Sequence, residues 1–412
     1  MANLFIDGAR VDGAGGAYDV HNPARPAEVV GQAPAADVAQ LDAAVVAARR
    51  AFRDWSALSI GERFELIVAA ANAAGAHATS ADLATLYTRE HGKVRSEAEF
   101  EFLTAPVLPQ ILGGMAEAAL APSLVEPPSA YPRLQREPYG VAALVIPFNW
   151  PIAVTMMKLS SALVAGNTVV AKVPPTVPLA LLDFGAELAA ALPPGVVNCL
   201  SGPGADISRA LVTHPGINVI SLTGGVATGK AVMAAAAERL TPVLLELGGN
   251  DAAIVTPDLA ITDALADQLF AATYTTAGQV CMAVKRLYCP RDRVAELADA
   301  LLARCEREVI GDGLAPETTL GPMHTAAGKD RITTMLAAAS VAGATIRTGG
   351  RLREEDAGSE GYFVLPTVVT DVPVDSVLVT EEQFGPALPI IAYDGVAEAI
   401  AAANEQGFGL TA

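Results

Sequence analysis

The chain is poor in cysteine and histidine, and each shortage argues against a class of site. Of its 412 residues, only four are cysteine and five are histidine. The cysteines stand at 199, 281, 289 and 305 without paired spacing, so the sequence predicts neither a disulfide framework nor a zinc site. The histidines are scattered, and no metal site is expected from them. Free thiols of this kind are typical of a reducing compartment, and we expect a cytoplasmic protein.

Basic residues and long apolar runs are also scarce. Lysine and arginine number 27 against 45 acidic residues, which gives a formal net charge of −18. Such a surface repels nucleic acid and anionic lipid, so neither is an expected partner. No window reaches the roughly 18 consecutive apolar residues of a membrane-spanning helix. The first residues read as a strand entering a turn rather than as a charged leader, so no membrane segment is predicted.

Apolar residues are abundant, and their pattern predicts the fold. They make up 52% of the chain, and the mean hydropathy is +0.37, enough for large buried cores in two or three domains. Short apolar runs alternate with helical patterns, and strands separated by helices imply a parallel sheet. We therefore predict a doubly wound α/β fold with strands at 141–146, ending at Lys172, at 196–200 and at 219–222, and with helices through Lys158 and at 178–191.

Two further regions flank this block. Residues 4–20 carry a hairpin signature with a turn at Asn22-Pro23, and helices are predicted around residues 41–55 and 62–77. A second alternation begins after Glu246, which suggests a domain boundary near that residue. Its predicted strands lie at 252–255 and 286–289, and its predicted helices at 260–273 and 291–308.

Two residues set the chemical question. Cys281 lies in the segment 274–286, and Glu246 lies in Leu-Glu-Leu-Gly-Gly-Asn at 245–250. A soft nucleophile and a carboxylate that acts as its base or activates water are the two parts that covalent acyl transfer needs. A lone cysteine in an apolar context is more often inert, and the other three cysteines are interpreted in that way.

Four more motifs stand in an order that identifies a family: 146–151 (Ile-Pro-Phe-Asn-Trp-Pro), Lys172, 223–225 (Thr-Gly-Gly) and 381–386 (Glu-Glu-Gln-Phe-Gly-Pro). Together with Cys281 and Glu246, they make the chain resemble the NAD(P)-dependent aldehyde dehydrogenases of the non-acylating type, from about Leu4 to the last residue.

The resemblance implies a Rossmann-like cofactor domain, an α/β catalytic domain and a small oligomerisation arm. The cofactor domain would comprise residues 1–118 and 141–246, the proline-rich arm 119–140, and the catalytic domain 247–412. It also implies a homodimer or homotetramer if the full-length C-terminus is present. Members of this family typically continue for several tens of residues beyond the point that corresponds to Ala412, so the end of the catalytic domain is expected to be missing.

The resemblance assigns four catalytic roles. Cys281 would be the nucleophile, and Asn149 would donate to the oxyanion together with the main-chain N–H of Cys281. Glu246 would activate the hydrolytic water or deprotonate the thiol, and Lys158 would support proton movement from Glu246. We expect Glu246 near a buried turn, where loss of water favours its neutral form.

The resemblance also assigns the cofactor residues. The turn 223–225 would present main-chain N–H groups to a pyrophosphate, Lys172 would contact the adenosine ribose, and Glu382 the nicotinamide ribose. Proline rather than a carboxylate stands three residues after Lys172, so we expect NAD with NADP tolerated. The complete predicted set is Ile146, Pro147, Phe148, Lys172, Pro175, Gly204, Thr223, Gly224, Gly225, Gly229, Leu247, Glu382 and Phe384.

The chain departs from the family pattern at two positions. Gly225 stands where a serine is usual, which removes one possible phosphate contact. Thr276 stands where an asparagine often precedes Gly-Gln.

The expected reaction is oxidation of an aldehyde to a carboxylic acid through a thiohemiacetal and a thioester on Cys281. Glu246 favours hydrolysis over transfer to coenzyme A. A semialdehyde dehydrogenase, a CoA-acylating relative and a catalytically silent binding or structural member of the fold remain alternatives. The small-molecule aldehyde is not specified by the sequence, although residues near Met156, Met157, Met282 and Phe384 are expected along its path.

Overall fold

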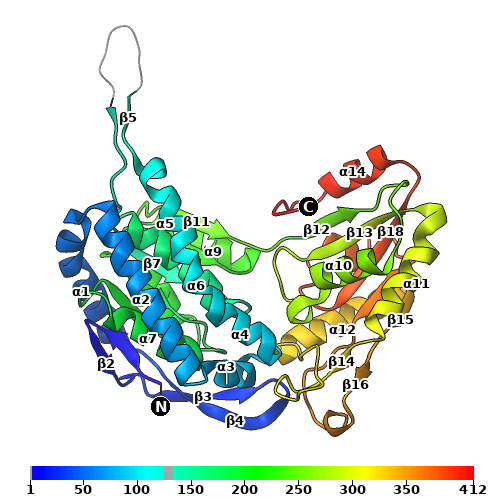
Figure 1. The fold of residues 1–412 in the computed structure, drawn as a ribbon, viewed down its shortest axis with the longest axis horizontal. Coiled ribbons are helices and arrows are strands. Elements are labelled where there is room, and N and C mark those ends of the chain that lie inside the picture. Colours follow the sequence, from blue (N-terminus) through cyan, green and yellow to red (C-terminus); the bar gives the residue numbers. More distant parts are fainter. Residues whose placement is uncertain (1, 125–132) are drawn as a thin grey trace. The chain divides into compact units, whose positions relative to one another are not determined.

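The computed structural model describes residues 2–124 and 133–412. Contacts within the chain divide it into two compact units, which are drawn in Figure 1. Unit 1 comprises the N-terminal residues up to Val20 together with Val29–Glu90 and Ala98–Leu247. Unit 2 comprises His21–Glu28, His91–Glu97 and Gly248–Ala412.

Strands and helices alternate through residues 141–247, as the sequence predicts. From the N-terminus to Leu247 the elements are β1 Leu4–Ile6, β2 Ala9–Val11, β3 Ala17–Asn22, β4 Arg25–Pro34, α1 Val38–Ala57, α2 Ile60–Ser80, α3 Leu83–His91, α4 Arg95–Thr104, α5 Val107–Leu120, β5 Ser123–Leu124, β6 Arg133–Leu134, β7 Val141–Val145, α6 Pro151–Val164, β8 Thr168–Lys172, α7 Leu179–Ala190, β9 Val197–Leu200, α8 Asp206–Thr213, β10 Val219–Thr223, α9 Val226–Ala237 and β11 Val243–Glu246.

The sheet of unit 1 has seven strands in the order β11-β10-β7-β8-β9-β1-β2. Strands β7 to β11 are parallel, whereas β1 and β2 form an antiparallel hairpin at one edge. The chain runs outward from β7 through β8 to β9 and then returns to place β10 on the other side of β7. Ligands of doubly wound folds bind at the carboxyl ends of the strands where the order reverses, which here are the ends of β7 and β10.

The two faces of this sheet are both covered, which explains the nearly continuous apolar runs that predicted its strands. Ala142 and Leu144 of β7 belong to a core shared with α2, α6 and α7. Val141 and Ala143, the alternate residues, belong to a second core shared with α1, α8 and α9. The predicted doubly wound arrangement is confirmed.

Local sequence signals set the starts of the first two helices. Asp37 accepts from Gln40 N while the Gln40 side chain accepts from Asp37 N, and Ser59 with Glu62 makes the same reciprocal cap. The predicted helix at 62–77 therefore begins slightly earlier, at Ile60.

Unit 2 is built around a five-stranded sheet in the order β12-β13-β18-β17-β15. β15 is antiparallel to β17 at one edge, and the other neighbouring strands are parallel. Its elements are β12 Asp251–Ile254, α10 Asp263–Tyr274, β13 Val284–Pro290, α11 Val294–Cys305, β14 Val309–Ile310, α12 Ala326–Val341, β15 Thr345–Thr348, β16 Arg351–Leu352, β17 Thr367–Thr370, α13 Val377–Thr380, β18 Ala387–Tyr393 and α14 Val396–Asn404, with 3-10 turns at Thr275–Gly278, Arg291–Arg293 and Glu354–Asp356.

Alternate residues of the central strands again face two cores. Tyr288 of β13 packs in a core with α12 and α14, whereas Leu287 and Cys289 pack in one with α10 and α11. The strands and helices predicted after Glu246 are confirmed, except that the helix expected at 291–308 starts with a 3-10 turn and is helical from Val294 to Cys305.

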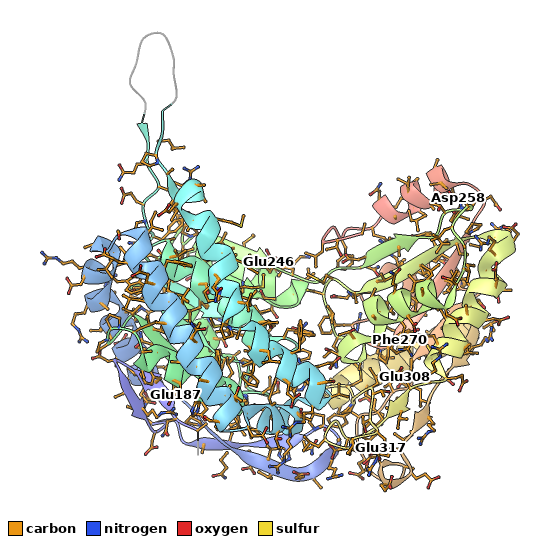
Figure 2. All side chains as sticks on the ribbon, in the orientation of Figure 1. Glu187, Glu246, Asp258, Phe270, Glu308 and Glu317 are labelled. Carbon is orange, nitrogen blue, oxygen red and sulfur yellow. The ribbon has the colours of Figure 1, made fainter. Side chains whose placement is uncertain are left out.

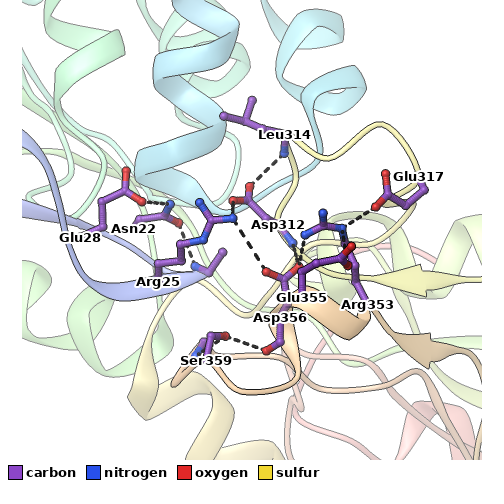
Figure 3. A network of polar contacts seen from close by, with 12 residues as sticks. Asn22, Arg25, Glu28, Asp312, Leu314, Glu317, Arg353, Glu355, Asp356 and Ser359 are labelled. Atoms are coloured by element: carbon purple, nitrogen blue, oxygen red, sulfur yellow. Dashed lines mark hydrogen bonds and ion pairs between the residues drawn. The ribbon is translucent and has the colours of Figure 1, made fainter.

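Two short segments from the N-terminal part of the chain, His21–Glu28 and His91–Glu97, belong to unit 2. The predicted cofactor domain, in contrast, includes both of them. Residues 21–28 are held by the ion pairs shown in Figure 3, where Arg25 contacts Asp312 at 2.9 Å and Asp356 at 4.0 Å. Asp356 is buried and also accepts from Asp312 N at 2.9 Å. Such long-range pairing leaves no periodic signal in the sequence. The functional names of the two domains stay predictions.

The predicted arm, 119–140, is described only in part. Strands β5 and β6 form an antiparallel pair, with Ser123 opposite Leu134. Pro127, Pro128 and Pro132 lie outside the described residues, and a role of the arm in oligomerisation stays a prediction.

Within residues 2–124 and 133–412, no helix combines the length and apolarity that crossing a bilayer requires.

Candidate active site

The loop after β7 carries Asn149. Ile146 is buried and donates its N–H to Lys172 O at 3.2 Å, which ties the loop to the end of β8. Asn149 itself is buried, and Pro151 begins α6 at the position where its missing N–H costs nothing. Pro147 and Phe148 are partly buried in the same loop. The amide predicted to hold an oxyanion therefore has a fixed setting at the carboxyl edge of the sheet.

A buried glutamate that the sequence analysis did not single out stabilises this loop. Glu101 of α4 accepts from Ile152 N at 3.2 Å and from Ala153 N at 3.1 Å. It thereby places a carboxylate at the positive N-terminal end of α6, and Tyr87 also donates to it at 2.5 Å. Periodicity alone gives no sign that an acidic residue will be buried.

The aromatic side chain beside Asn149 has a ring partner. Phe100 meets Trp150 edge to face, with centroids 6.3 Å apart. Met157, on the outer face of α6, is half exposed, whereas Met156 is fully buried in the core. Met156 itself is therefore part of the core, and the expectation that residues near it line the path of the aldehyde stays a prediction.

Lys172 ends β8 as a buried ammonium. Only 5% of the residue is exposed, and burial lowers the pKa of Lys172 to about 8. Among the described residues, no carboxylate or hydrogen-bond acceptor is paired with it. Three residues further on, Pro175 is partly buried and supplies no charge. A buried cation of this kind requires a polar partner, which ribose oxygens would provide.

The turn after β10 leaves the start of α9 open. Gly224 N donates to Glu246 O at 3.0 Å, and Thr223 pairs with Glu246 across β10 and β11. Gly225 is the N-cap of α9, and no heavy atom lies within 4 Å of the position that its Cβ would take. The open N-terminal turn of a helix suits a pyrophosphate.

Two further predicted cofactor glycines have different surroundings. A Cβ on Gly229 would lie 2.6 Å from Leu247 Cδ2, so the absence of a side chain lets α9 approach Leu247. Gly204 lies in the exposed β9–α8 loop with a φ of +77°, a conformation that favours glycine.

Glu246 is not buried as predicted. It is exposed at the carboxyl end of β11 and is labelled in Figure 2. The expectation of a buried turn is wrong because β11 is an edge strand, whose residues alternate between partly buried and exposed.

Lys158 reaches from α6 toward the same strands. Its ammonium donates to Ser221 Oγ of β10 at 2.8 Å. Burial lowers the pKa of Lys158 to about 8, and the negative charge of Glu246 opposes part of that shift. The two groups are therefore coupled electrostatically, and a proton path between them stays a prediction.

In unit 2, Cys281 follows an unusual backbone segment. Thr276, Ala277 and Gly278 all have positive φ, at +54°, +53° and +71°. Glu97 accepts from Thr276 N at 2.7 Å, and a Cβ on Gly278 would lie 2.5 Å from Gly385 O. Three consecutive left-handed residues are rare, and such conformations concentrate at functional sites.

The thiol of Cys281 differs from the other three. Cys199, Cys289 and Cys305 are buried, and burial raises their pKa to about 12, 11 and 12. Cys281 is only partly buried. Burial raises its pKa, but the main-chain N–H groups of Met282 and Cys281 and the charge of Lys285 offset part of that effect. The expectation that the other three are inert core residues agrees with their burial.

Glu382 lies beside the Cys281 loop within the same unit. Its Oε1 accepts from Gly249 N at 3.1 Å and lies 3.8 Å from Lys285 Nζ. Phe384, two residues further on, has a φ of +52°. Gly248 permits this approach, because a Cβ there would lie 2.1 Å from Glu382 Oε2. Met282 is more than half exposed at the same loop.

The structure brings together one group of possible metal ligands that the sequence did not suggest. Within the described ranges, the ligand atoms of His77, Asp183 and Glu187 lie within 4.8 Å of one another. Arg10 already pairs with both carboxylates, at 2.9 and 2.6 Å, and Glu187 is labelled in Figure 2. The guanidinium therefore neutralises one of the two negative charges that a bound cation would meet.

Thr276 gives a test of the strained segment. A left-handed backbone costs a residue with a Cβ roughly 1–2 kcal/mol, β-branching adds to this, and asparagine tolerates it best. Thr276→Asn is therefore expected to raise the free energy of unfolding by about 1 kcal/mol, measured by urea denaturation. The matched control is Thr275→Asn, at a neighbour with φ of −49°, which should not stabilise. A less stable Thr276→Asn protein would contradict the strain argument.

Known proteins resemble the whole chain. A family model described as "Aldehyde dehydrogenase family" matches residues 11–412. A 3,6-anhydro-alpha-L-galactose dehydrogenase from Streptomyces coelicolor is 34% identical over 411 residues, covering 99% of this chain and 82% of that protein.

Solved structures agree. An aldehyde dehydrogenase from Brucella melitensis biovar abortus 2308 matches with a TM-score of 0.92 at 30% identity, covering all of this chain and 83% of that one. A betaine aldehyde dehydrogenase from Staphylococcus aureus, solved in complex with NAD+, matches with a TM-score of 0.91 at 28% identity, covering all of this chain and 82% of that one.

Proposed function

Because the chain belongs to the aldehyde dehydrogenase family, as its motifs predict, we propose that it oxidises an aldehyde to a carboxylic acid, with NAD or NADP as hydride acceptor and Cys281 as nucleophile. The observation that carries this proposal is the setting of Cys281. It is the one partly exposed cysteine of the described residues, and main-chain N–H groups and the Lys285 ammonium favour its thiolate.

The first half of the reaction makes an acyl-enzyme. The Cys281 thiolate attacks the aldehyde carbon and forms a thiohemiacetal. The Asn149 side-chain amide and the main-chain N–H of Cys281 stabilise the negative oxygen, and a neutral amide does so without holding the substrate too tightly beforehand. Collapse of this adduct expels a hydride and leaves a thioester on Cys281.

The second half releases the acid. Glu246 activates a water that attacks the thioester carbon, and Lys158, coupled to Glu246, helps to remove the proton. The thiolate of Cys281 is the leaving group, so the enzyme is restored. The overall balance is one aldehyde, one water and one oxidised cofactor giving one carboxylic acid, one reduced cofactor and one proton.

The chain's own residues fit a dinucleotide. The open start of α9 at Gly225 would take the pyrophosphate, the buried Lys172 the adenosine ribose, and Glu382 the nicotinamide ribose. When bound, the nicotinamide supplies the site that accepts the hydride. The Staphylococcus aureus relative was solved with NAD+, which supports NAD as the cofactor.

The test is absorbance at 340 nm with the purified protein, NAD or NADP, and a panel of aliphatic, aromatic and semialdehyde substrates. The panel includes 3,6-anhydro-α-L-galactose, after the name of the Streptomyces relative. Mass analysis of the product, with and without coenzyme A, separates a free acid from an acyl-CoA. Free acid with cofactor reduction supports the proposal, whereas silence across the panel favours a non-catalytic role.

Residue 175 gives a test of cofactor choice. Pro175→Glu places a carboxylate three residues after Lys172, where it can bond the ribose 2′-hydroxyl and repel a 2′-phosphate. The KM for NADP is expected to rise about tenfold or more, with the KM for NAD unchanged or lower. The matched control, Thr176→Glu, adds the same charge one residue later at an exposed position. It should change the ratio of the KM for NADP to the KM for NAD less than Pro175→Glu does. An unchanged KM ratio in Pro175→Glu would place the adenosine ribose elsewhere.

A further inference from the structure

Lys285 is a buried cation next to the proposed nucleophile. It lies at the start of β13, and only 3% of the residue is exposed. Its ammonium donates to three main-chain carbonyls of the preceding turn, at 2.8 Å to Val280 O, 2.6 Å to Cys281 O and 3.4 Å to Ala283 O. The side chain therefore folds back and closes the turn that carries Cys281.

This closure has a direct effect on the thiol. The carbonyls of Val280 and Cys281 are directed to the ammonium, while the N–H groups of Cys281 and Met282 act on the sulfur. N–H groups and a nearby cation both favour a thiolate over a thiol. An uncharged side chain at 285 would leave three main-chain carbonyls without the ammonium that they accept from, and would loosen the turn.

Lys285 also faces Glu382. The Nζ to Oε1 distance is 3.8 Å, and the same oxygen accepts from Gly249 N. Burial raises the pKa of the Glu382 carboxyl, and Lys285 is the largest opposing influence. The ammonium thus lies between the turn of the nucleophile and the carboxylate assigned to the nicotinamide ribose.

The other charged groups of unit 2 near this pair are few. Asp251 of β12 acts on Lys285, and Arg331 of α12 acts on Glu382. Arg286, the next residue of β13, faces the other way, since its guanidinium donates to Asn250 O, Tyr288 Oη and Ala403 O. Among these described groups, Lys285 is the cation that acts on the sulfur.

We propose that Lys285 is a positioning residue that holds the Cys281 turn through three carbonyls and offsets the charge of Glu382, which favours the thiolate of Cys281 over its thiol. The inference rests on the proposed role of Cys281 as nucleophile. The family resemblance assigns no role to Lys285, and a lysine at the start of a strand is ordinarily a solvated surface residue.

The test is the pH dependence of Cys281 alkylation by iodoacetamide in the purified protein without cofactor, followed by mass analysis of the peptide that holds Cys281. Lys285→Met is expected to move the midpoint of alkylation upward by about one pH unit or more. The reason is that a nearby opposite charge typically shifts the pKa of an ionisable group by about one to three units. Lys285→Arg retains the charge and should move the midpoint less. The matched control is Lys329→Met, which also removes a lysine bonded to a carbonyl, that of Gly361, and should leave the midpoint unchanged.

A second variant keeps the test decisive if Lys285→Met does not fold. Glu382→Gln removes the opposing charge and leaves the ammonium in place, so the midpoint should fall. A folded Lys285→Met protein with the wild-type midpoint, or a Glu382→Gln midpoint that is unchanged or higher, would overturn the inference. Alkylation needs no turnover, so these outcomes are separate from failure of the proposed function, which the aldehyde panel reports.

Discussion

Replacing Cys281 with alanine is expected to abolish cofactor reduction, with a fall in kcat on the order of 10⁴-fold or more, because no other group can form the thioester. Steady-state absorbance at 340 nm measures the loss, and a thermal unfolding curve checks that the protein stays folded. Cys281 is partly exposed and makes little core packing, so its loss should cost little stability.

The matched control is Cys289→Ala, which removes a buried thiol from β13, the strand that follows the Cys281 turn. Burial raises the pKa of Cys289 to about 11, so it contributes no thiolate near neutral pH. This variant should lose some stability and keep its kcat. If activity survives in Cys281→Ala and disappears in Cys289→Ala, Cys281 is not the nucleophile.

Replacing Asn149 with alanine is expected to lower the rate of acylation by about 10²- to 10³-fold, the effect typical of losing one oxyanion donor. Stopped-flow absorbance at 340 nm in a single turnover measures this step apart from deacylation. The rate of Cys281 alkylation by iodoacetamide should stay near that of the wild type, because no oxyanion develops in that reaction.

Asn149→Asp serves as the control, because aspartate has nearly the same size as asparagine but carries a negative charge. A carboxylate would put negative charge where the oxyanion develops, so acylation should be at least as slow as in Asn149→Ala. If Asn149→Asp instead acylates at the wild-type rate, Asn149 does not contact the reacting oxygen.

The strands that the sequence predicted well are those that are covered by helices on both faces of the sheet. The strand at 141–145 packs against a core on each face, so its residues form an uninterrupted apolar run. Glu246 shows the limit of the same reasoning. Its strand lies at the sheet edge, and a single sequence does not say which strand of a parallel sheet will have one neighbour.

The parts that sequence analysis missed depend on partners distant in the chain. Glu101 meets the start of α6 some 50 residues away, and Arg25 meets Asp312 across most of the sequence. Neither contact has a periodicity or a spacing that a local pattern can report. Thr276 departs from the family pattern, and the positive φ at that position gives a physical reason why asparagine suits it.

The mass of the tryptic peptide Leu240–Lys285, which contains Cys281 as its single cysteine, reports directly whether a thioester forms on this residue. The protein would be mixed with a reactive aldehyde and cofactor and quenched in acid at times from milliseconds to seconds. We expect a mass increase equal to the acyl group, located on Cys281 and removed by hydroxylamine. Cofactor reduction in the first turnover with this peptide unmodified at every time would rule out Cys281 as the nucleophile.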